Sequence, residues 1–154
     1  MTGEFKKDRR VEFSETDMAG IIHYSSYFQY MEETEHEFLR SLGLSVVLEE
    51  DGVSYGFPRL ATRGEYSRPL RFEEVVNIHL RIRRIGRGSI TYQYLFSLES
   101  REVARGEVTV ACVTRDEEGN MKSSRLPSKL SSEISVYPGE ALGFGPQPNL
   151  GGAG

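Results

Sequence analysis

The sequence has one cysteine, no long apolar run and no excess of positive charge, and each shortage excludes a class of protein. The single cysteine, Cys112, cannot form an internal disulfide, which is typical of a reducing compartment. No stretch approaches the roughly 20 apolar residues of a membrane span, and the charged residues 1–10 lack the apolar segment of a secretory signal. A net charge of −4 argues against a broad nucleic-acid-binding surface. We therefore expect a cytoplasmic protein that neither spans a membrane nor binds nucleic acid.

The strongest pattern that is present predicts one long helix. Ser26 and Gln29 match a capping box, so the first helical residue is predicted near Tyr27. Gly43 is well placed to end the helix. Between these limits the apolar side chains recur at helical spacing and form one stripe: Tyr27, Met31, Thr34, Phe38 and Leu42.

Strand patterns surround this helix. Residues 9–13 alternate as a short strand with Val11 and Phe13 facing inward. After the helix, strands are predicted at 60–66, 76–82, 90–98 and 108–112. Residues 86–88 (Gly-Arg-Gly) are predicted to join two of them in a hairpin, because glycine supplies positive φ. The order of one strand, one long helix and four strands in a meander predicts an α+β domain.

The pattern fades after the last strand, and the final stretch is rich in glycine, proline and asparagine. We predict a single domain over residues 1–130 and a tail over residues 131–154 that is disordered or loosely attached. One helix covers only one face of a five-stranded sheet, and an open sheet also leaves strand edges unpaired. A homodimer is therefore expected.

The candidate site is the segment between the first strand and the helix, where Asp17 lies. A carboxylate beside a helix N-terminus has free backbone N–H groups nearby, and the helix dipole favours its ionised form. These are the two parts needed to attack a carbonyl carbon and to hold the oxyanion that forms. Gly20 allows a tight backbone path in the same loop. The alternative is that Asp17 only caps a turn, which is a common role of aspartate.

This segment resembles the hotdog-fold acyl-CoA thioesterases of the 4-hydroxybenzoyl-CoA thioesterase family, including its Tol–Pal-linked acyl-CoA branch. The resemblance rests on Val11-Glu12-Phe13-x-x-Thr16-Asp17-x-Ala19-Gly20-Ile21-Ile22-His23-Tyr24-x-x-Tyr27 and on a Glu-rich helix ending at Gly43. It continues through Glu65-Tyr66 and Pro69 to Arg125-Leu126-Pro127. It covers roughly residues 8–130. It implies a hotdog fold, in which a five-stranded antiparallel sheet wraps one long central helix, and homodimers that pair into homotetramers with active sites at the dimer interface.

The resemblance also implies roles for individual residues. The catalytic carboxylate of the family maps onto Asp17, and its oxyanion-binding backbone N–H maps onto Tyr24. Either direct attack by Asp17 or activation of a water by Asp17 fits the residues. His23 could orient a water or contact the substrate, and a structural histidine is the equal alternative. The acyl-CoA branch often carries Tyr then His at these two positions, so the order His23-Tyr24 leans toward the aryl-CoA members.

Further residues are expected to bind the substrate. Tyr27, Met31 and residues 59–62, which include Arg59, are expected to line the acyl tunnel. Arg87 and Ser89 at the hairpin turn are expected to hold the CoA phosphates through charge-assisted hydrogen bonds, with ordinary solvated surface as the alternative. No metal site and no redox cofactor are expected, because CoA belongs to the substrate.

The predicted function is hydrolysis of an acyl-CoA or aryl-CoA to the free acid and CoA. Two alternatives stay open: a non-catalytic acyl-CoA-binding or regulatory hotdog protein, and a thioesterase acting on acyl carrier protein. A hydratase or dehydratase on the same fold is disfavoured, because the sequence lacks the paired histidine and carboxylate motif of those enzymes. A fold alone does not establish which of these holds.

Overall fold

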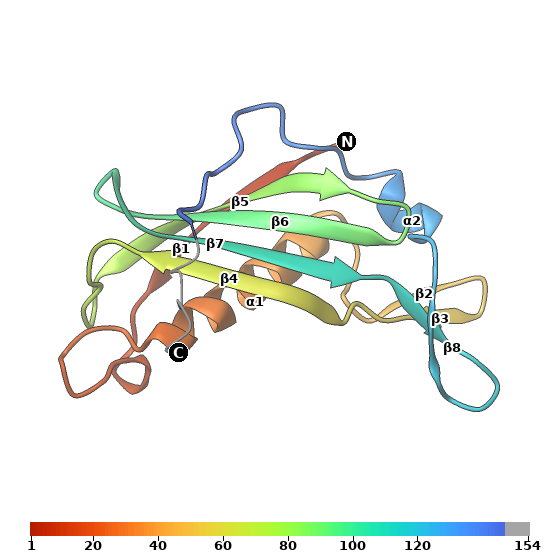
Figure 1. The fold of residues 1–154 in the computed structure, drawn as a ribbon, viewed down its shortest axis with the longest axis horizontal. Helices are drawn as coiled ribbons and strands as arrows, with labels where there is room; N and C mark the ends of the chain where they lie inside the picture. Colours follow the sequence, from red (N-terminus) through yellow and green to blue (C-terminus); the bar gives the residue numbers. More distant parts are fainter. Residues whose placement is uncertain (147–154) are drawn as a thin grey trace, which may run out of the picture.

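The computed structural model describes residues 1–146, in which one antiparallel sheet lies across one long helix (Figure 1). The helix is α1 (Tyr24–Ser41), and the sheet has the strand order β1-β5-β6-β7-β4. Its strands are β1 (Glu4–Arg10), β4 (Arg59–Tyr66), β5 (Val75–Ile85), β6 (Ser89–Leu98) and β7 (Arg101–Ala111). The smaller elements are η1 (Phe13–Glu15), β2 (Leu48–Glu50), β3 (Val53–Tyr55), β8 (Val113–Arg115), β9 (Met121–Ser123) and α2 (Ser128–Ser131).

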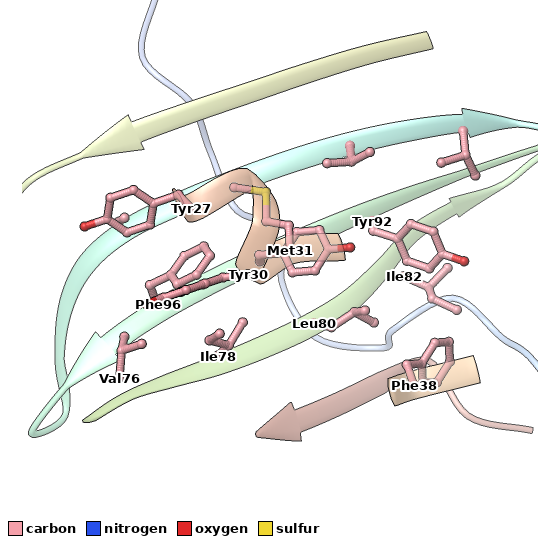
Figure 2. Packing of buried hydrophobic residues seen from close by; sticks show 14 of the residues in the cluster. Tyr27, Tyr30, Met31, Phe38, Val76, Ile78, Leu80, Ile82, Tyr92 and Phe96 are labelled. Carbon is pink, nitrogen blue, oxygen red and sulfur yellow. The ribbon is translucent and has the colours of Figure 1, made fainter. Parts of the chain in front are cut away.

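The core lies between α1 and the inner face of the sheet (Figure 2). Alternate residues of the central strands point toward the helix, as the pleat of a strand requires. Where the helix comes closest, Met31 occupies the space above Gly106, and a Cβ at that glycine would collide with the thioether. The fully buried side chains include Tyr30, Phe38, Ile78, Leu80, Ile82, Tyr92 and Phe96. Each such side chain stabilises the fold by about 1.5–3 kcal/mol.

The predicted start of the helix was wrong by one turn, and the predicted end is confirmed. α1 begins at Tyr24, and His23 is the N-cap, whose Nδ1 accepts a hydrogen bond from the Ser25 backbone N–H at 3.3 Å. Ser26 does not cap the helix, because its hydroxyl donates to the Glu15 carbonyl at 3.3 Å. Gly43 follows the helix with φ = 74°, which a glycine adopts without strain. The first free amide of α1 therefore belongs to Tyr24.

The first strand also lies earlier than predicted. β1 spans Glu4–Arg10, whereas Phe13 lies in η1, is 76% exposed and packs edge-on against Phe72. This strand lacks the usual alternation of apolar and polar residues, because most of its side chains are charged. Lys7 pairs with Glu37 of the helix, and the inward-leaning members of an edge strand need not be apolar when the helix offers such partners.

The predicted meander holds for β5, β6 and β7, but β4 does not lie beside β5. β4 pairs with β7 and forms the opposite edge of the sheet from β1. Residues 67–74 therefore carry the chain from the β4 edge to β5, the neighbour of the opposite edge strand, past the start of α1. Leu70 in this crossing is buried, and its carbonyl accepts the Ile22 N–H at 2.7 Å. The crossing segment is thereby held against the Asp17 loop.

The glycines of the β5–β6 turn are needed for space and not for positive φ. Gly88 has negative φ, and a Cβ there would collide with the Ser124 carbonyl oxygen. Positive φ occurs instead in the β6–β7 turn, at Glu99 (49°) and Ser100 (66°). This is the left-handed region, in which a residue with a Cβ is strained.

Replacing Ser100 with glycine is expected to stabilise the protein by about 0.5–1 kcal/mol, because the strain of a Cβ at positive φ disappears. Thermal or urea unfolding followed by circular dichroism measures the change. Ser97→Gly, at a strand residue of the same hairpin, is the control and is expected to destabilise. Stabilisation by neither variant, or by both, would contradict the assignment of strain to position 100.

Residues 131–146, predicted as part of a loose tail, run across the outer face of the sheet. Ile134 is buried and forms a bridge with Thr2, and the Tyr137 N–H donates to the Ile82 carbonyl at 2.8 Å. Farther along, the Gln93 amide holds the Leu142 backbone through a donated bond of 3.1 Å and an accepted bond of 2.8 Å. The composition of this segment does not reveal that its backbone has a hydrogen-bonding partner on the sheet, the Gln93 side chain. The rest of the predicted tail, residues 147–154, lies outside the described residues.

None of the helices described over residues 1–146 combines the length and the apolar character needed to cross a membrane.

Candidate active site

A cavity of about 410 Å³ opens where the Asp17 loop, the start of α1 and the crossing segment meet. The loop closes on itself, because Thr16 bridges to Ile22 and the Asp17 N–H donates to the Ile21 carbonyl at 2.9 Å. Gly20, with φ = 77°, makes the tight turn between them. The walls are formed by Asp17, Ile21, Ile22, Tyr24, Tyr27, Tyr66, Ser67, Arg68 and Pro69.

Asp17 contributes a carboxylate in which one oxygen accepts a hydrogen bond and the other accepts none within residues 1–146. Its Oδ1 accepts the Ala19 N–H at 2.8 Å, which is the turn-capping role that the sequence leaves as an alternative. Over residues 1–146, no hydrogen bond engages its Oδ2. Capping and catalysis are therefore compatible, because one oxygen holds the turn while the other is available to a ligand in the cavity.

The Tyr24 backbone N–H is the natural partner for a developing oxyanion. It is the first amide of α1, and such amides have no acceptor within their own helix. In the described part of the chain it makes no hydrogen bond elsewhere. An oxygen bound there meets both the N–H and the positive end of the helix dipole.

His23 has a structural role in this arrangement. Its Nδ1 lies 2.7 Å from the Ser25 hydroxyl and caps the helix, and its ring stacks on Tyr24 at 4.6 Å between ring centroids. The walls of the cavity do not include His23. The predicted contact of His23 with substrate or water has no support in this geometry and stays untested.

Glu15 fastens the Asp17 loop to the helix, and sequence reasoning did not select it. Its carbonyl accepts the His23 N–H at 2.8 Å, and its carboxylate accepts the Tyr30 hydroxyl at 2.7 Å and pairs with Arg9 at 2.7 Å. Burial raises the pKa of Glu15, but these hydrogen bonds, together with one from the Glu12 N–H, outweigh it and lower the pKa. Glu15 therefore stays ionised and holds the loop.

Tyr27 and Tyr66 form an aromatic wall, with ring centroids 4.9 Å apart. Tyr27 is buried, and this burial, followed by the nearby Tyr66, raises the pKa of Tyr27 to about 12. Its hydroxyl therefore stays protonated at neutral pH. Two neighbouring rings, tilted by 34° to each other, line the same cavity as Asp17 and offer an apolar contact to an acyl group. The predicted position of Tyr27 at the substrate site is consistent with this geometry.

The other predicted binding residues lie elsewhere. Met31 and Arg59 line a second, separate cavity of about 230 Å³, formed by residues of α1, β4, β6 and β7. Arg87 and Ser89 lie at the β5–β6 turn, at the opposite end of the sheet from the start of α1 (Figure 1). Within one chain, the structure does not bring them to the Asp17 cavity.

Tyr66 and Arg68 also line the Asp17 cavity without having been selected from the sequence. Both follow from the topology, because the end of β4 and the crossing segment return to the start of α1. A strand pattern predicts that β4 exists but not which edge it occupies, and so gives no sign that its last residue lies beside Tyr27.

The model of the family described as the thioesterase-like superfamily matches residues 11–134. The chain belongs to the thioesterase-like superfamily. Within this superfamily, a protein of Aquifex aeolicus (strain VF5) is 36% identical over 108 residues, which cover 70% of this chain and 83% of the relative. A 1,4-dihydroxy-2-naphthoyl-CoA hydrolase of Synechococcus sp. (strain CC9311) is 29% identical over 105 residues, covering 64% of this chain and 69% of the relative.

The solved structures agree with this membership. A gentisyl-coenzyme A thioesterase superposes with a TM-score of 0.73 at 27% identity, covering 85% of this chain and 100% of that chain. The resemblance found in the sequence and the predicted α+β hotdog fold are thereby confirmed. The family match extends to residue 134 and so includes α2 and Ile134, beyond the predicted domain limit at residue 130.

Proposed function

We propose that this member of the thioesterase-like superfamily hydrolyses the thioester of an acyl-CoA or aryl-CoA to the free acid and CoA. One observation carries the proposal: Asp17 and Tyr24, the first residue of α1, line the same cavity at a helix N-terminus. A thioester needs little further activation, because thiolate is a good leaving group. A carboxylate and an oxyanion-binding N–H are then sufficient.

The chemistry follows from the two free groups. The thioester oxygen accepts the Tyr24 N–H, which stabilises the negative charge that develops on it. Asp17 either attacks the carbonyl carbon, forming a mixed anhydride that water then hydrolyses, or removes a proton from an attacking water. In both routes the C–S bond breaks, the thiolate takes up a proton, and the products are the acid and CoA.

Release of free thiol from a panel of CoA esters tests this function. The names of the relatives favour including aromatic esters, since one acts on 1,4-dihydroxy-2-naphthoyl-CoA and another on gentisyl-coenzyme A. Binding without thiol release from any aliphatic or aromatic ester would favour the non-catalytic alternative. Faster release from acyl carrier protein than from the matching CoA ester would favour the carrier-protein alternative.

The proposed enzyme is a homodimer joined through β4. Both β1 and β4 are edge strands, but β1 is densely charged, which discourages edge pairing. β4 instead exposes Leu60 (64%) and Tyr66 (45%). Antiparallel pairing of two copies would place the Tyr66 end of one strand beside the Arg59 end of the other. It would also turn the β5–β6 turn of one copy toward the Asp17 cavity of the other, which supports a role of Arg87 in binding CoA.

The pairing of two dimers into a homotetramer stays a prediction. Residues 133–146 cover much of the outer sheet face. Two dimers would therefore have to pair through this segment or through the part of the face that it leaves uncovered. The molar mass from light scattering distinguishes dimer from tetramer. A cytoplasmic location and the absence of metal and redox cofactors from the reaction also stay predictions.

Arg68→Gln is expected to raise KM for CoA esters by about three- to tenfold with little change in kcat. Arg68 lines the Asp17 cavity, and a guanidinium is suited to bind a phosphate of CoA. Arg71→Gln is the matched control, because Arg71 is also exposed on the crossing segment but does not line the cavity. Equal KM values for wild type and both variants would exclude Arg68 from CoA binding.

A further inference from the structure

His23 contributes a side chain that contacts the candidate site from outside the cavity. It is the N-cap of α1, and the next residue is Tyr24, which lines the Asp17 cavity whereas His23 does not. The imidazole stacks on the Tyr24 ring, with the ring centroids 4.6 Å apart and the ring planes 29° apart. His23 is therefore joined to a cavity residue both by a peptide bond and by ring contact.

His23 also determines which amide of the helix start is free. Its Nδ1 accepts the Ser25 backbone N–H at 3.3 Å, and its carbonyl accepts the Ser26 N–H at 2.9 Å. Its own N–H donates to the Glu15 carbonyl at 2.8 Å, which fixes its position. Of the first three amides of α1, the Tyr24 N–H alone has no acceptor within residues 1–146. An oxygen at this helix end can therefore bind the Tyr24 amide without competing with the cap.

The hydrogen bonds of this cap require an uncharged imidazole. Nδ1 accepts the Ser25 backbone N–H at 3.3 Å and lies 2.7 Å from the Ser25 hydroxyl. A ring nitrogen accepts a hydrogen bond only when it carries no proton, so the single proton of the ring lies on Nε2. The side chain that caps α1 therefore has no net charge.

An uncharged histidine is not the cap that helix stability alone favours. Aspartate is among the preferred N-cap residues, and the positive end of the helix dipole stabilises its charge. At position 23, however, a carboxylate would lie one residue from the Tyr24 amide, where the thioester oxygen becomes negative. Two negative charges a few ångströms apart repel each other, and both would depend on the same end of the dipole. A neutral cap leaves that end of the dipole to the oxyanion.

We propose that His23 is a positioning residue for the developing oxyanion. It caps α1 as a neutral group, keeps the Tyr24 amide free for the thioester oxygen, and adds no negative charge beside that oxygen. The proposal rests on the proposed thioesterase function, since that function places an oxyanion at Tyr24. His23 acts through Tyr24 and touches neither the substrate nor the reacting atoms.

Three substitutions of His23 separate its capping role from its charge. Asparagine caps as a neutral group, aspartate caps with a charge, and alanine does not cap. All three lose the ring contact with Tyr24, so this loss does not distinguish them. His23→Asn is expected to keep kcat within threefold of the wild type. His23→Asp is expected to lower kcat by about 10- to 100-fold with little change in KM, because the repulsion acts on the transition state. His23→Ala is expected to lower kcat by about five- to tenfold.

His36→Asp is the matched control for the added charge. His36 lies in the same helix, about 18 Å beyond Tyr24 along its axis, and does not line the Asp17 cavity. The exchange changes the net charge of the protein as His23→Asp does, and kcat is expected to stay within threefold of the wild type. Equal losses of kcat in the two variants would assign the effect to net charge and contradict the proposal. Circular dichroism verifies that each variant is folded.

A measurement without turnover separates failure of this proposal from failure of the hydrolase proposal. In Asp17→Asn, the infrared carbonyl stretch of a bound CoA ester, isotope-labelled at the carbonyl carbon, reports how strongly the Tyr24 amide polarises the thioester. The stretch is expected at lower frequency with histidine or asparagine at position 23 than with aspartate or alanine. The same stretch in all four proteins would overturn the role of His23 whatever the kinetics.

The kinetic outcomes are equally distinct. Thiol release by the wild type, with equal kcat in His23→Asn and His23→Asp, would overturn the role of His23 and leave the hydrolase proposal standing. No thiol release from any ester, together with the expected dependence of the carbonyl stretch on position 23, would overturn the hydrolase and retain His23 as the residue that positions the Tyr24 amide.

Discussion

Asp17→Asn is expected to lower kcat for CoA-ester hydrolysis by about 10²- to 10⁴-fold, the range typical of losing a general base, and to leave stability almost unchanged. Asparagine retains a side-chain oxygen, so it can still accept the Ala19 N–H that Asp17 Oδ1 accepts at 2.8 Å. The turn is therefore kept, while the negative charge of the Asp17 side chain is lost. Single-turnover and steady-state thiol release measure the effect.

Asp116→Asn is the matched control for this variant. Asp116 is also exposed and also caps a turn, accepting the Asn120 N–H at 2.9 Å, but it does not line the Asp17 cavity. It is expected to keep wild-type activity. Activity of Asp17→Asn within threefold of the wild type would remove Asp17 from the reaction and reduce it to the turn-capping role.

Glu15→Ala is expected to destabilise the protein by about 2–4 kcal/mol and to lower kcat by about tenfold or more in the fraction that remains folded. The substitution leaves the Tyr30 hydroxyl without a partner and removes one of the two carboxylates that pair with Arg9, the other being Glu33 at 3.0 Å. Because Glu15 reaches the cavity only by holding the Asp17 loop, it is a positioning residue. Kinetics measured well below the unfolding temperature separate positioning from loss of folded protein.

Two further variants sharpen the Glu15 test. Glu15→Gln keeps an acceptor for Tyr30 but loses the charge, so an intermediate loss of stability is expected. Glu37→Ala, which removes an ion pair with Lys7 remote from the cavity, is expected to leave kcat unchanged. Equal kcat for folded Glu15→Ala and wild type would show that the loop holds Asp17 without this support.

The stability difference between wild type and Glu15→Gln is expected to depend on pH. The pKa of Glu15 is lowered in the folded state, so its ionised form stabilises the fold above the unfolded pKa of about 4.3. That contribution is lost as the pH falls through the lowered folded pKa. The difference in free energy of unfolding should therefore be largest at neutral pH and disappear in acid. Urea unfolding at several pH values measures it.

The sequence predicts this fold well wherever apolar periodicity is strong. The stripe from Tyr27 to Phe38 and the alternation in β5 and β6 each bury one face, so the class of fold follows. β1 was misplaced because two of its three inward side chains, Lys7 and Arg9, are charged and pair with glutamates of the helix. The neighbour of β4 was misplaced because strand periodicity does not encode which edge a strand takes.

The site divides in the same way. Asp17 and the Tyr24 amide follow from local sequence, since a loop before a helix places a carboxylate near free N–H groups whatever lies elsewhere. Tyr66, Arg68 and the support from Glu15 depend on contacts across the fold, which a single sequence does not display.

A crystal structure of Asp17→Asn with an uncleaved CoA ester tests the joint action of Asp17 and the Tyr24 amide most directly. The thioester oxygen is expected about 2.7–3.1 Å from the Tyr24 nitrogen, with the side chain at position 17 about 3–3.5 Å from the carbonyl carbon. A thioester bound in any other place, with the Tyr24 amide facing solvent, would contradict the mechanism.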